Sequence, residues 1–290
     1  MQAAKLFSWQ RATPVEPIQP ELIIEPGQGM AHYWRDLWRY RELFFFLAWR
    51  DIAVRYKQTV IGVAWAVVRP LLTMIVFTVV FGRLAGLPTE GETPYAILVY
   101  AAMLPWQFFA NALSESSNSL ISNAQMITKV YFPRLAIPLA AVVVSFVDFL
   151  ISFSILVLLM GWYQFWPTWR LVVLPLLVLL AFGAAMGGGL WMASLNVKYR
   201  DFRYIIPFVV QFGLYLSPEG FSSTIVPEQW RLLYSLNPMV GVIDGFRWAI
   251  LGTGTIYWPS FLVSVALVVG LLASGLWYFR KTERTFADVI

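Results

Sequence analysis

The chain has 290 residues, of which 59% are hydrophobic and only 13% charged, and its mean hydropathy is +0.66. Soluble domains carry about twice this charged fraction, so the composition excludes a soluble globule, a disordered chain and a coiled coil and predicts an integral membrane protein. The sequence has no cysteine and one histidine, His32, which argues against a disulfide-rich scaffold, a thiolate metal site and a histidine-based catalytic triad.

The N-terminal region precedes any apolar run of spanning length. Residues 1–30 contain four prolines, so we expect a loose cytoplasmic tail and no cleavable signal peptide. In residues 31–58, apolar side chains recur at Leu37, Tyr40, Phe44 and Leu47. This spacing predicts an amphipathic helix in the cytoplasmic headgroup layer, and simple anchoring is the alternative to a more specific role.

Six apolar runs follow, each long enough to be read as a membrane span, since a spanning helix needs about 20 apolar residues. The fifth is weakened by Pro207 at its start and by Ser217-Pro218-Glu219-Gly220 at its end. The expected spans are Val60–Phe81, Tyr95–Leu113, Ile137–Gly161, Leu171–Leu195, Tyr204–Phe221 and Tyr257–Phe279.

The basic residues orient these spans. Of the 21 Lys and Arg residues, 16 lie in the tails and in the loops after spans two and four. Because basic residues gather on the cytoplasmic side, both termini are predicted to be cytoplasmic. The net charge of +5 then reflects topology, and binding to nucleic acid is not expected.

The loop between spans two and three, Ser114–Arg134, contains a helical stripe formed by Leu120, Ala124 and Ile127. The serines and asparagines ahead of the stripe are typical of a helix start. We interpret the loop as a short cytoplasmic helix that docks a soluble partner, with a plain connecting loop as the alternative.

The outer segment Ser222–Thr255 contains two helical stretches too short to span. A first helix can begin at Pro227, Asn237-Pro238 interrupts it, and Val240–Leu251 forms the second. Such a pair is typical of a re-entrant hairpin whose backbone faces protein or water. It is either an outer gate or a packing element.

Polar residues within the spans suggest a transport path, because charges at membrane depth are costly. A small and polar stripe runs along span one and contains Arg69, while Asp148 lies on span three. A pairing of Arg69 with Asp148 is one possibility that the sequence leaves open. Span five carries an aromatic stripe that suits either helix packing or the stacking of sugar rings. Gly187-Gly188-Gly189 on span four predicts close helix packing.

Several motifs are missing from the sequence. There is no G-x-x-x-x-G-K-[ST] phosphate-binding loop, no H-E-x-x-H and no G-x-S-x-G. We therefore expect no catalytic site, no metal site and no cofactor in this chain.

Four separated stretches resemble type-2 ABC-transporter permeases, and more narrowly the polysaccharide exporters for O-antigen and wall teichoic acid. The resemblance runs from about Tyr33 to the C-terminus, and Arg69-Pro70 stands where that family usually has Gln-Pro. The stretches are Trp49–Ala66, Tyr131–Arg134, Asn196–Asp201 and Leu236–Met239.

This resemblance implies an all-α membrane protein of six spans in residues 59–290, with an interfacial helix over Asp36–Lys57, a coupling helix over Asn118–Lys129 and re-entrant outer helices over Pro227–Leu251. It implies a homodimer with two separate ATP-binding cassette subunits, which would bind ATP and magnesium.

Three sets of site residues follow from the resemblance and the stripes. The expected channel lining is Thr59, Gly62, Trp65, Ala66, Arg69, Thr73, Tyr204, Phe208, Gln211, Phe212 and Tyr215. The expected coupling residues are Asn118, Leu120, Asn123, Met126, Ile127 and Lys129. The expected outer gate is Glu219, Trp230, Asn237 and Pro238.

The predicted function is the membrane subunit of an ATP-driven exporter of lipid-linked polysaccharide, of the O-antigen kind, in a bacterial inner membrane. One alternative is export of a small drug or lipid by the same architecture. An alternative of another class is a membrane-bound glycosyltransferase or polymerase, although the acidic residues of the outer loops, such as Glu90 and Asp244, do not cluster in the sequence.

Overall fold

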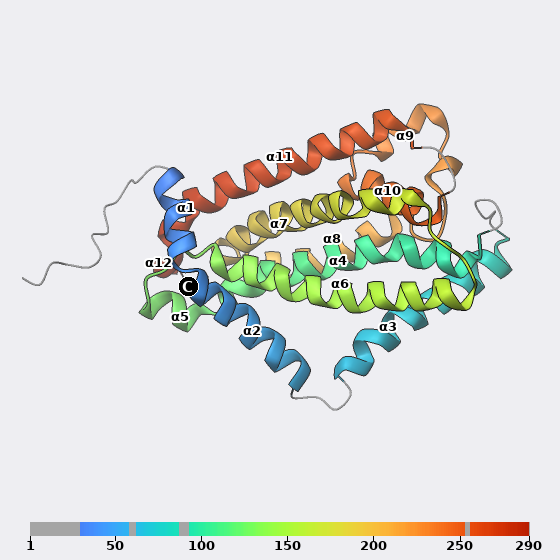
Figure 1. Ribbon diagram of the computed structural model, residues 1–290. Coiled ribbons are helices and arrows are strands. Elements are labelled where there is room, and N and C mark those ends of the chain that lie inside the picture. The colour runs from blue at the N-terminus through green and yellow to red at the C-terminus, as the bar shows by residue number, and fades with distance from the viewer. Residues whose placement is uncertain (1–29, 58–61, 87–92, 253–255, 290) are drawn as a thin grey trace, which may run out of the picture.

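The computed structural model describes residues 30–57, 62–86, 93–252 and 256–289, and these form helices and turns with no strand among them (Figure 1). Five helical segments within these ranges are long and apolar enough to cross a membrane. They are Ala64–Leu84, Tyr95–Ser122, Ala136–Trp162, Trp169–Lys198 and Trp258–Thr285.

These segments correspond to the first, second, third, fourth and sixth expected spans. The fifth expected span differs, because helix α8 covers only Phe202–Tyr215. Its 14 residues rise about 21 Å, which is short of the ~30 Å hydrocarbon core. The helix ends there because Ser217-Pro218 follows, and proline lacks the N–H that would continue the helical ladder.

The helix order runs along the chain as follows. The N-terminal helices are α1 (Met30–Arg39), α2 (Arg41–Lys57) and α3 (Gly62–Phe77), the last continuing as the π-helical turn η1 (Thr78–Leu84). Next come α4 (Tyr95–Ser122), α5 (Ala124–Lys129), α6 (Ala136–Trp162), the 3₁₀ turn η2 (Trp169–Val173), α7 (Leu174–Lys198) and α8. The C-terminal part has η3 (Ser223–Ile225), α9 (Glu228–Tyr234), α10 (Pro238–Leu251), α11 (Trp258–Thr282), η4 (Glu283–Thr285) and α12 (Phe286–Val289).

Helix α4 forms the centre of the bundle. It packs against α6 and α7, and α7 in turn packs against α11. Glycines make the contact between α7 and α11 close. A Cβ on Gly187 of α7 would lie 2.6 Å from the backbone nitrogen of Leu272 on α11. A Cβ on Gly275 of α11 would lie 2.5 Å from the carbonyl oxygen of Gly187. The close helix approach predicted from the glycines is therefore confirmed.

Helix α10 lies inside the bundle, where it contacts α4, α7 and α11. Asn237 caps its start by accepting a hydrogen bond from the backbone N–H of Met239, and Pro238 occupies its first turn. Its end at Gly252 has a φ of 67°, a left-handed conformation that glycine adopts at no steric cost. The two short helices expected between residues 227 and 251 are thus present as α9 and α10.

The single interfacial helix expected over Asp36–Lys57 is wrong in its extent, because the N-terminal region forms two helices, α1 and α2, which are separated by a turn at Tyr40. The predicted stripe of Leu37, Tyr40, Phe44 and Leu47 packs against the core of the bundle. A second set of aromatic side chains points outward instead: Trp38, Phe45, Phe46 and Trp49. The outward set was not singled out in the sequence, and it is this set that is free to contact lipid.

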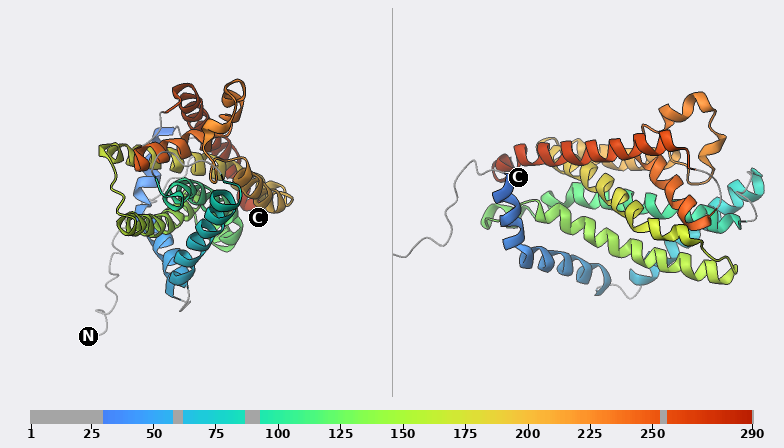
Figure 2. Two further views of the ribbon diagram at one scale, coloured as in Figure 1. Left: turned by 90° about the vertical axis from the view of Figure 1, so that its right-hand side faces the viewer. Right: turned by 45° about the horizontal axis from the view of Figure 1, so that its top comes forward.

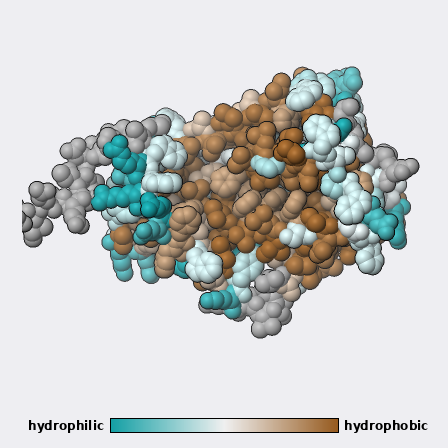
Figure 3. All heavy atoms as spheres, in the orientation of Figure 1, coloured by the Kyte–Doolittle hydropathy of each residue, from teal (hydrophilic) through white to brown (hydrophobic). Residues whose placement is uncertain are grey.

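The two ends of the bundle differ in character. Helices α1, α5 and α12 gather at one end, here called the α5 end, and α9 lies at the other, here called the α9 end (Figure 1). Between a hydrophilic α5 end and a paler α9 end, the face seen in Figure 3 is a broad hydrophobic band. This band and the five long apolar helices describe a multi-pass membrane protein.

Candidate functional site

The serine-rich stretch at the α5 end is the last part of α4. Its side chains bond back to carbonyls of their own helix, as in the bonds from Ser117 to Leu113, from Ser122 to Asn118 and from Asn123 to Ser119. With these side chains bonded to its own carbonyls, α4 continues to Ser122. The expected single coupling helix over Asn118–Lys129 is therefore wrong in its extent, since it is the end of α4 and the six-residue helix α5.

The expected coupling residues divide into a packed set and an exposed set. Leu120 and Ile127 are buried, and Met126 packs against the core from a half-buried position. Lys129 is exposed. The surface that a partner can reach consists mainly of residues outside the predicted coupling set, namely Gln125, Thr128, Val130 and Tyr131.

Two asparagines fix the corner between α4 and α5. Asn196 of α7 donates to the carbonyl oxygen of Ser117 and to the side-chain oxygen of Asn118, at 3.0 and 3.1 Å. Asn123, between the two helices, accepts a hydrogen bond of 2.9 Å from Arg50 of α2. The corner is thus bound to both α7 and α2.

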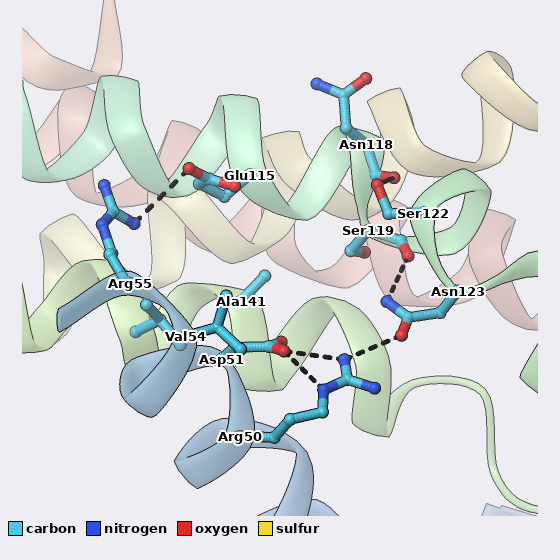
Figure 4. A pocket seen from close by; sticks show the side chains of 11 residues that line it. Arg50, Asp51, Val54, Arg55, Glu115, Asn118, Ser119, Ser122, Asn123 and Ala141 are labelled. Carbon is cyan, nitrogen blue, oxygen red and sulfur yellow. Dashed lines mark hydrogen bonds and ion pairs between the residues drawn. The ribbon is translucent and has the colours of Figure 1, made fainter. Parts of the chain in front are cut away.

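A polar cavity of about 490 Å³ lies between α2 and the ends of α4 and α6 (Figure 4). Arg50 reaches from α2 toward Asn123 across one side of it, and Arg55 faces Glu115 of α4 across the other, at 3.5 Å. The remaining lining is mostly small or polar: Asp51, Val54, Asn118, Ser119, Ser122, Ala141 and Val144.

The carboxylate of Asp148 on α6 holds the far end of α2. It lies 2.9 Å from the Arg55 guanidinium and accepts a hydrogen bond from the hydroxyl of Tyr56. Burial and the adjacent Asp148 raise the pKa of Tyr56. The possible pairing of Arg69 with Asp148 is not made, because Asp148 is occupied by α2 and Arg69 forms no ion pair with any residue of the described ranges.

A C-terminal tie joins the α4–α6 connection to the last long helix. Glu283, directly after α11, accepts a hydrogen bond of 2.9 Å from the backbone N–H of Arg134 and one of 3.3 Å from the hydroxyl of Tyr33. The Arg134 guanidinium donates to the carbonyl oxygen of Glu283, and α12 contacts α5. Burial is the main reason that the pKa of Tyr33 is raised. The sequence reasoning missed Glu283, although it noted Tyr131–Arg134.

Helix α3 is largely exposed in the single chain. Of its most apolar stretch only 11% is buried, and Trp65 is 60% exposed. Arg69 is exposed, Ala66 is half-buried, and the Thr73 hydroxyl donates to the carbonyl oxygen of Arg69 at 2.9 Å. Gly62 is the first residue of α3, and Thr59 lies outside the residues that the structure describes.

Helix α8 presents its aromatic stripe outward. Tyr204 is 79% exposed, Tyr215 is 69% exposed, and Gln211 is exposed as well. The rings of Phe208 and Phe212 lie 4.1 Å apart, centroid to centroid. Since α8 packs on α4 and α7 through its other side, these rings are not used for packing within the chain.

The expected outer gate divides in a similar way. Trp230 is exposed on α9, whereas Glu219 is 1% exposed. Asn237 is half-buried and donates to the hydroxyl of Ser217 at 2.9 Å, so it ties the start of α10 to the end of the α8 segment. Pro238 is the first residue of α10, where its fixed φ suits the start of a helix.

Glu219 belongs to a buried polar cluster at the α9 end that the sequence did not predict. Arg247 of α10, 2% exposed, donates to the carbonyl oxygens of Phe221 and Glu219 at 2.6 and 3.0 Å. Tyr95 donates to the carbonyl oxygen of Gly220 at 2.5 Å. No described residue donates to either carboxyl oxygen of Glu219. The signal for this cluster was a charged residue, Arg247, inside the apolar run Val240–Leu251.

Most of the helices just described fall within the sequence pattern of a known family. The model of the ABC-2 type transporter family matches residues 42–251, which run from α2 to the end of α10. The chain belongs to the ABC-2 type transporter family. Membership makes it a transport subunit embedded in the membrane, and it confirms the resemblance drawn from the four sequence stretches.

Similar proteins extend this match over most of the chain. This ABC-2 family member is 27% identical over 259 residues to an O-antigen export system permease protein RfbA of Myxococcus xanthus, covering 88% of this chain and 98% of that protein. Two Klebsiella pneumoniae proteins of the same name are 26% and 25% identical, each covering 86% of this chain and 95% of the relative.

Proposed function

We propose that this chain is the membrane subunit of an ATP-driven exporter that moves a lipid-linked polysaccharide, of the O-antigen kind, across a bacterial inner membrane. The names of the relatives support the substrate class. The observation that carries the proposal is the pair of exposed helices α3 and α8, which present Trp65, Tyr204, Phe208 and Tyr215 away from their own bundle.

In the proposed assembly, two copies of the chain face one another through α3 and α8, and these helices line the path. Aromatic faces suit the C–H faces of sugar rings, and many weak contacts allow a long polymer to slide. The segment from Phe202 to Phe221 provides the sixth crossing, with α8 as its regular part. In this proposal the α5 end and both termini lie in the cytoplasm, which the distribution of basic residues supports.

ATP and magnesium would be bound by two separate ATP-binding cassette subunits. Their proposed contact is the exposed side of α5 and the following residues, Gln125, Thr128, Lys129, Val130 and Tyr131. The ties of this corner to α2 through Asn123 and to α11 through Glu283 suit the transmission of motion into the bundle. The chain itself would hold no cofactor.

The decisive experiment is reconstitution of the chain with an ATP-binding cassette subunit in vesicles. We expect ATP-dependent movement of a polyprenyl-diphosphate-linked polysaccharide across the membrane, and no movement when ATP is withheld. ATP-dependent movement of a lipid or drug without the polysaccharide would favour the transport alternative. Extension of the polymer from nucleotide sugars would favour the glycosyltransferase alternative.

A further inference from the structure

A second cavity, distinct from the transport path and the coupling corner, lies at the α9 end of α6. It has a volume of about 370 Å³ and opens between α6, the loop that follows it, and α10. Its lining is apolar throughout and consists of Phe153, Leu156, Val157, Met160, Gly161, Phe165, Trp166, Pro167, Leu171 and Ile250.

The walls of this cavity divide into a buried floor and an exposed rim. Leu156 and Ile250 are fully buried and Met160 is 7% exposed, whereas Val157 and Trp166 are exposed. The floor therefore belongs to the core of the bundle, and the rim belongs to the outward surface of α6.

The rim is continuous with the surface that faces lipid. Figure 3 shows the hydrophobic band ending at the α9 end in pale side chains. In the loop region beside the cavity, Trp162, Trp166 and Trp169 are all strongly exposed, as expected for side chains at headgroup depth. In the end-on view of Figure 2, the loop after α6 and helix α8 lie on opposite sides of the bundle. The cavity thus faces away from α8.

The lining favours a hydrocarbon chain over the other possible occupants. A water molecule needs two to four polar partners, and apolar cavities are dry. A non-helical protein segment brings backbone N–H and C=O groups, which this lining cannot satisfy. An empty space would leave the buried floor without dispersion contacts on one side.

A fixed positive charge near the rim favours a phospholipid as the source of that chain. Arg170 precedes the lining residue Leu171, and its guanidinium donates to the carbonyl oxygen of Gly252 at 2.8 Å, two residues after the lining residue Ile250. It also lies over the ring of Trp248 at 5.0 Å. An arginine has five N–H donors, so one held in this way can still bind a phosphate.

We propose that this cavity binds one acyl chain of a phospholipid of the outer leaflet, with the phosphate held near Arg170. The bound chain fills the space between α6 and α10 and supports the loop that joins α6 to η2. The site is independent of the proposed substrate and of any ATP-binding partner.

Gly161 allows a sharp test, because it lines the cavity and a Cβ added to it meets no atom within 4 Å. Gly161→Trp should fill the cavity, and Gly161→Leu should fill it in part. Gly270→Trp and Gly270→Leu on α11 are the matched controls, since a Cβ at Gly270 also meets nothing within 4 Å and the residue does not line the cavity. Size-exclusion chromatography and thermal unfolding compare the folding of all four variants.

The full chain is reconstituted in vesicles of phosphatidylethanolamine and phosphatidylglycerol that contain a phospholipid with a diazirine at the end of one acyl chain. After illumination, labelled peptides are identified by mass spectrometry. We expect labelling at Met160 and Phe165 in the natural chain and in both Gly270 variants. It should be reduced in Gly161→Leu and should fall in Gly161→Trp to the level at Val269, an exposed residue of α11.

Three results would overturn the proposal. One is labelling at Met160 and Phe165 that Gly161→Leu and Gly161→Trp both leave unchanged. The second is labelling of the cavity by a diazirine-bearing polyprenyl phosphate but not by the phospholipid. The third comes from Arg170→Gln. We expect this variant to lower labelling by the phospholipid and to leave labelling by a long-chain alcohol with the same diazirine unchanged. An equal effect on both probes would rule out the phospholipid source.

Discussion

Arg247 and Glu219 lie in the buried polar cluster at the α9 end, where they are 2% and 1% exposed. Arg247→Met should destabilise the protein strongly, because it leaves two carbonyl oxygens without donors and the Glu219 carboxyl without a nearby positive charge. Leaving a buried acceptor without its donor costs about 1–3 kcal/mol for each group. Thermal unfolding of the purified chain measures this loss.

The exposed Arg83 provides the control for this prediction, and Arg83→Met should leave the unfolding temperature nearly unchanged. The double variant Glu219→Leu, Arg247→Met should recover part of the loss, since it also removes the buried Glu219 carboxyl, whose oxygens accept no hydrogen bond from a described residue. Equal unfolding temperatures for Arg247→Met and Arg83→Met would contradict a structural role for the cluster.

Arg69 offers the opposite case, since it is exposed on α3 and has no ion-pair partner among the described residues. Both Arg69→Gln and Arg69→Leu should therefore fold as the natural chain does. Export should be reduced more by leucine than by glutamine, because glutamine keeps a polar side chain toward the proposed path. Vesicle transport assays with matched amounts of protein test this, and identical export by the two variants would exclude a polar role.

At the scale of single elements, the structure separates residues of α5 that the sequence treated alike. Ile127 is 4% exposed, so Ile127→Asp should impair folding rather than coupling alone. Lys129→Glu lies on the exposed side and should leave folding intact while lowering ATP-driven export. Measuring ATP hydrolysis and export together distinguishes the two effects. Normal export by the double variant Lys129→Glu, Gln125→Asp would exclude docking of the ATP-binding subunit on the exposed side of α5.

The aromatic stripe of α8 provides a second test at this scale. Phe208→Ala and Tyr215→Ala remove exposed rings, so each should leave stability unchanged and lower export, and the pair should lower it further. Phe149→Ala on α6 is the structural control, since Phe149 is buried and such truncations cost about 3–5 kcal/mol. A loss of stability in the α8 variants without a selective loss of export would assign these rings to packing.

The elements themselves were largely predictable, and their ends were not. Runs of about 20 apolar residues located five helices because the membrane imposes that length. The end of α4 was misplaced because serine and asparagine are typical of helix starts, whereas here their side chains bond back to the preceding turn. Helix α8 is shorter than the expected span, because the Ser217-Pro218 break lies inside an otherwise apolar run.

At the scale of the whole molecule, the pairings between distant residues were beyond the sequence. Arg247 and Glu219 are separated by 28 residues, and Glu283 and Arg134 by 149, with no local spacing that relates them. Asp148 looked free to meet Arg69 because the sequence could not show that α2 folds back along α6. The same packing of α2 along α6 decides which side of α2 faces the core, and it turns Phe44 and Leu47 inward.

The exposed faces of α3 and α8 lead to a prediction about assembly. Leu72 on α3 and Phe212 on α8 are each 52% exposed, and the chain contains no cysteine that would interfere. If two copies face one another through these helices, the double variant Leu72→Cys, Phe212→Cys should form a covalent dimer of twice 33.1 kDa on mild oxidation in vesicles. Leu158→Cys, 73% exposed on α6, should remain a monomer under the same conditions. Crosslinking through Leu158 and not through the α3–α8 pair would place the interface elsewhere and remove the proposed path.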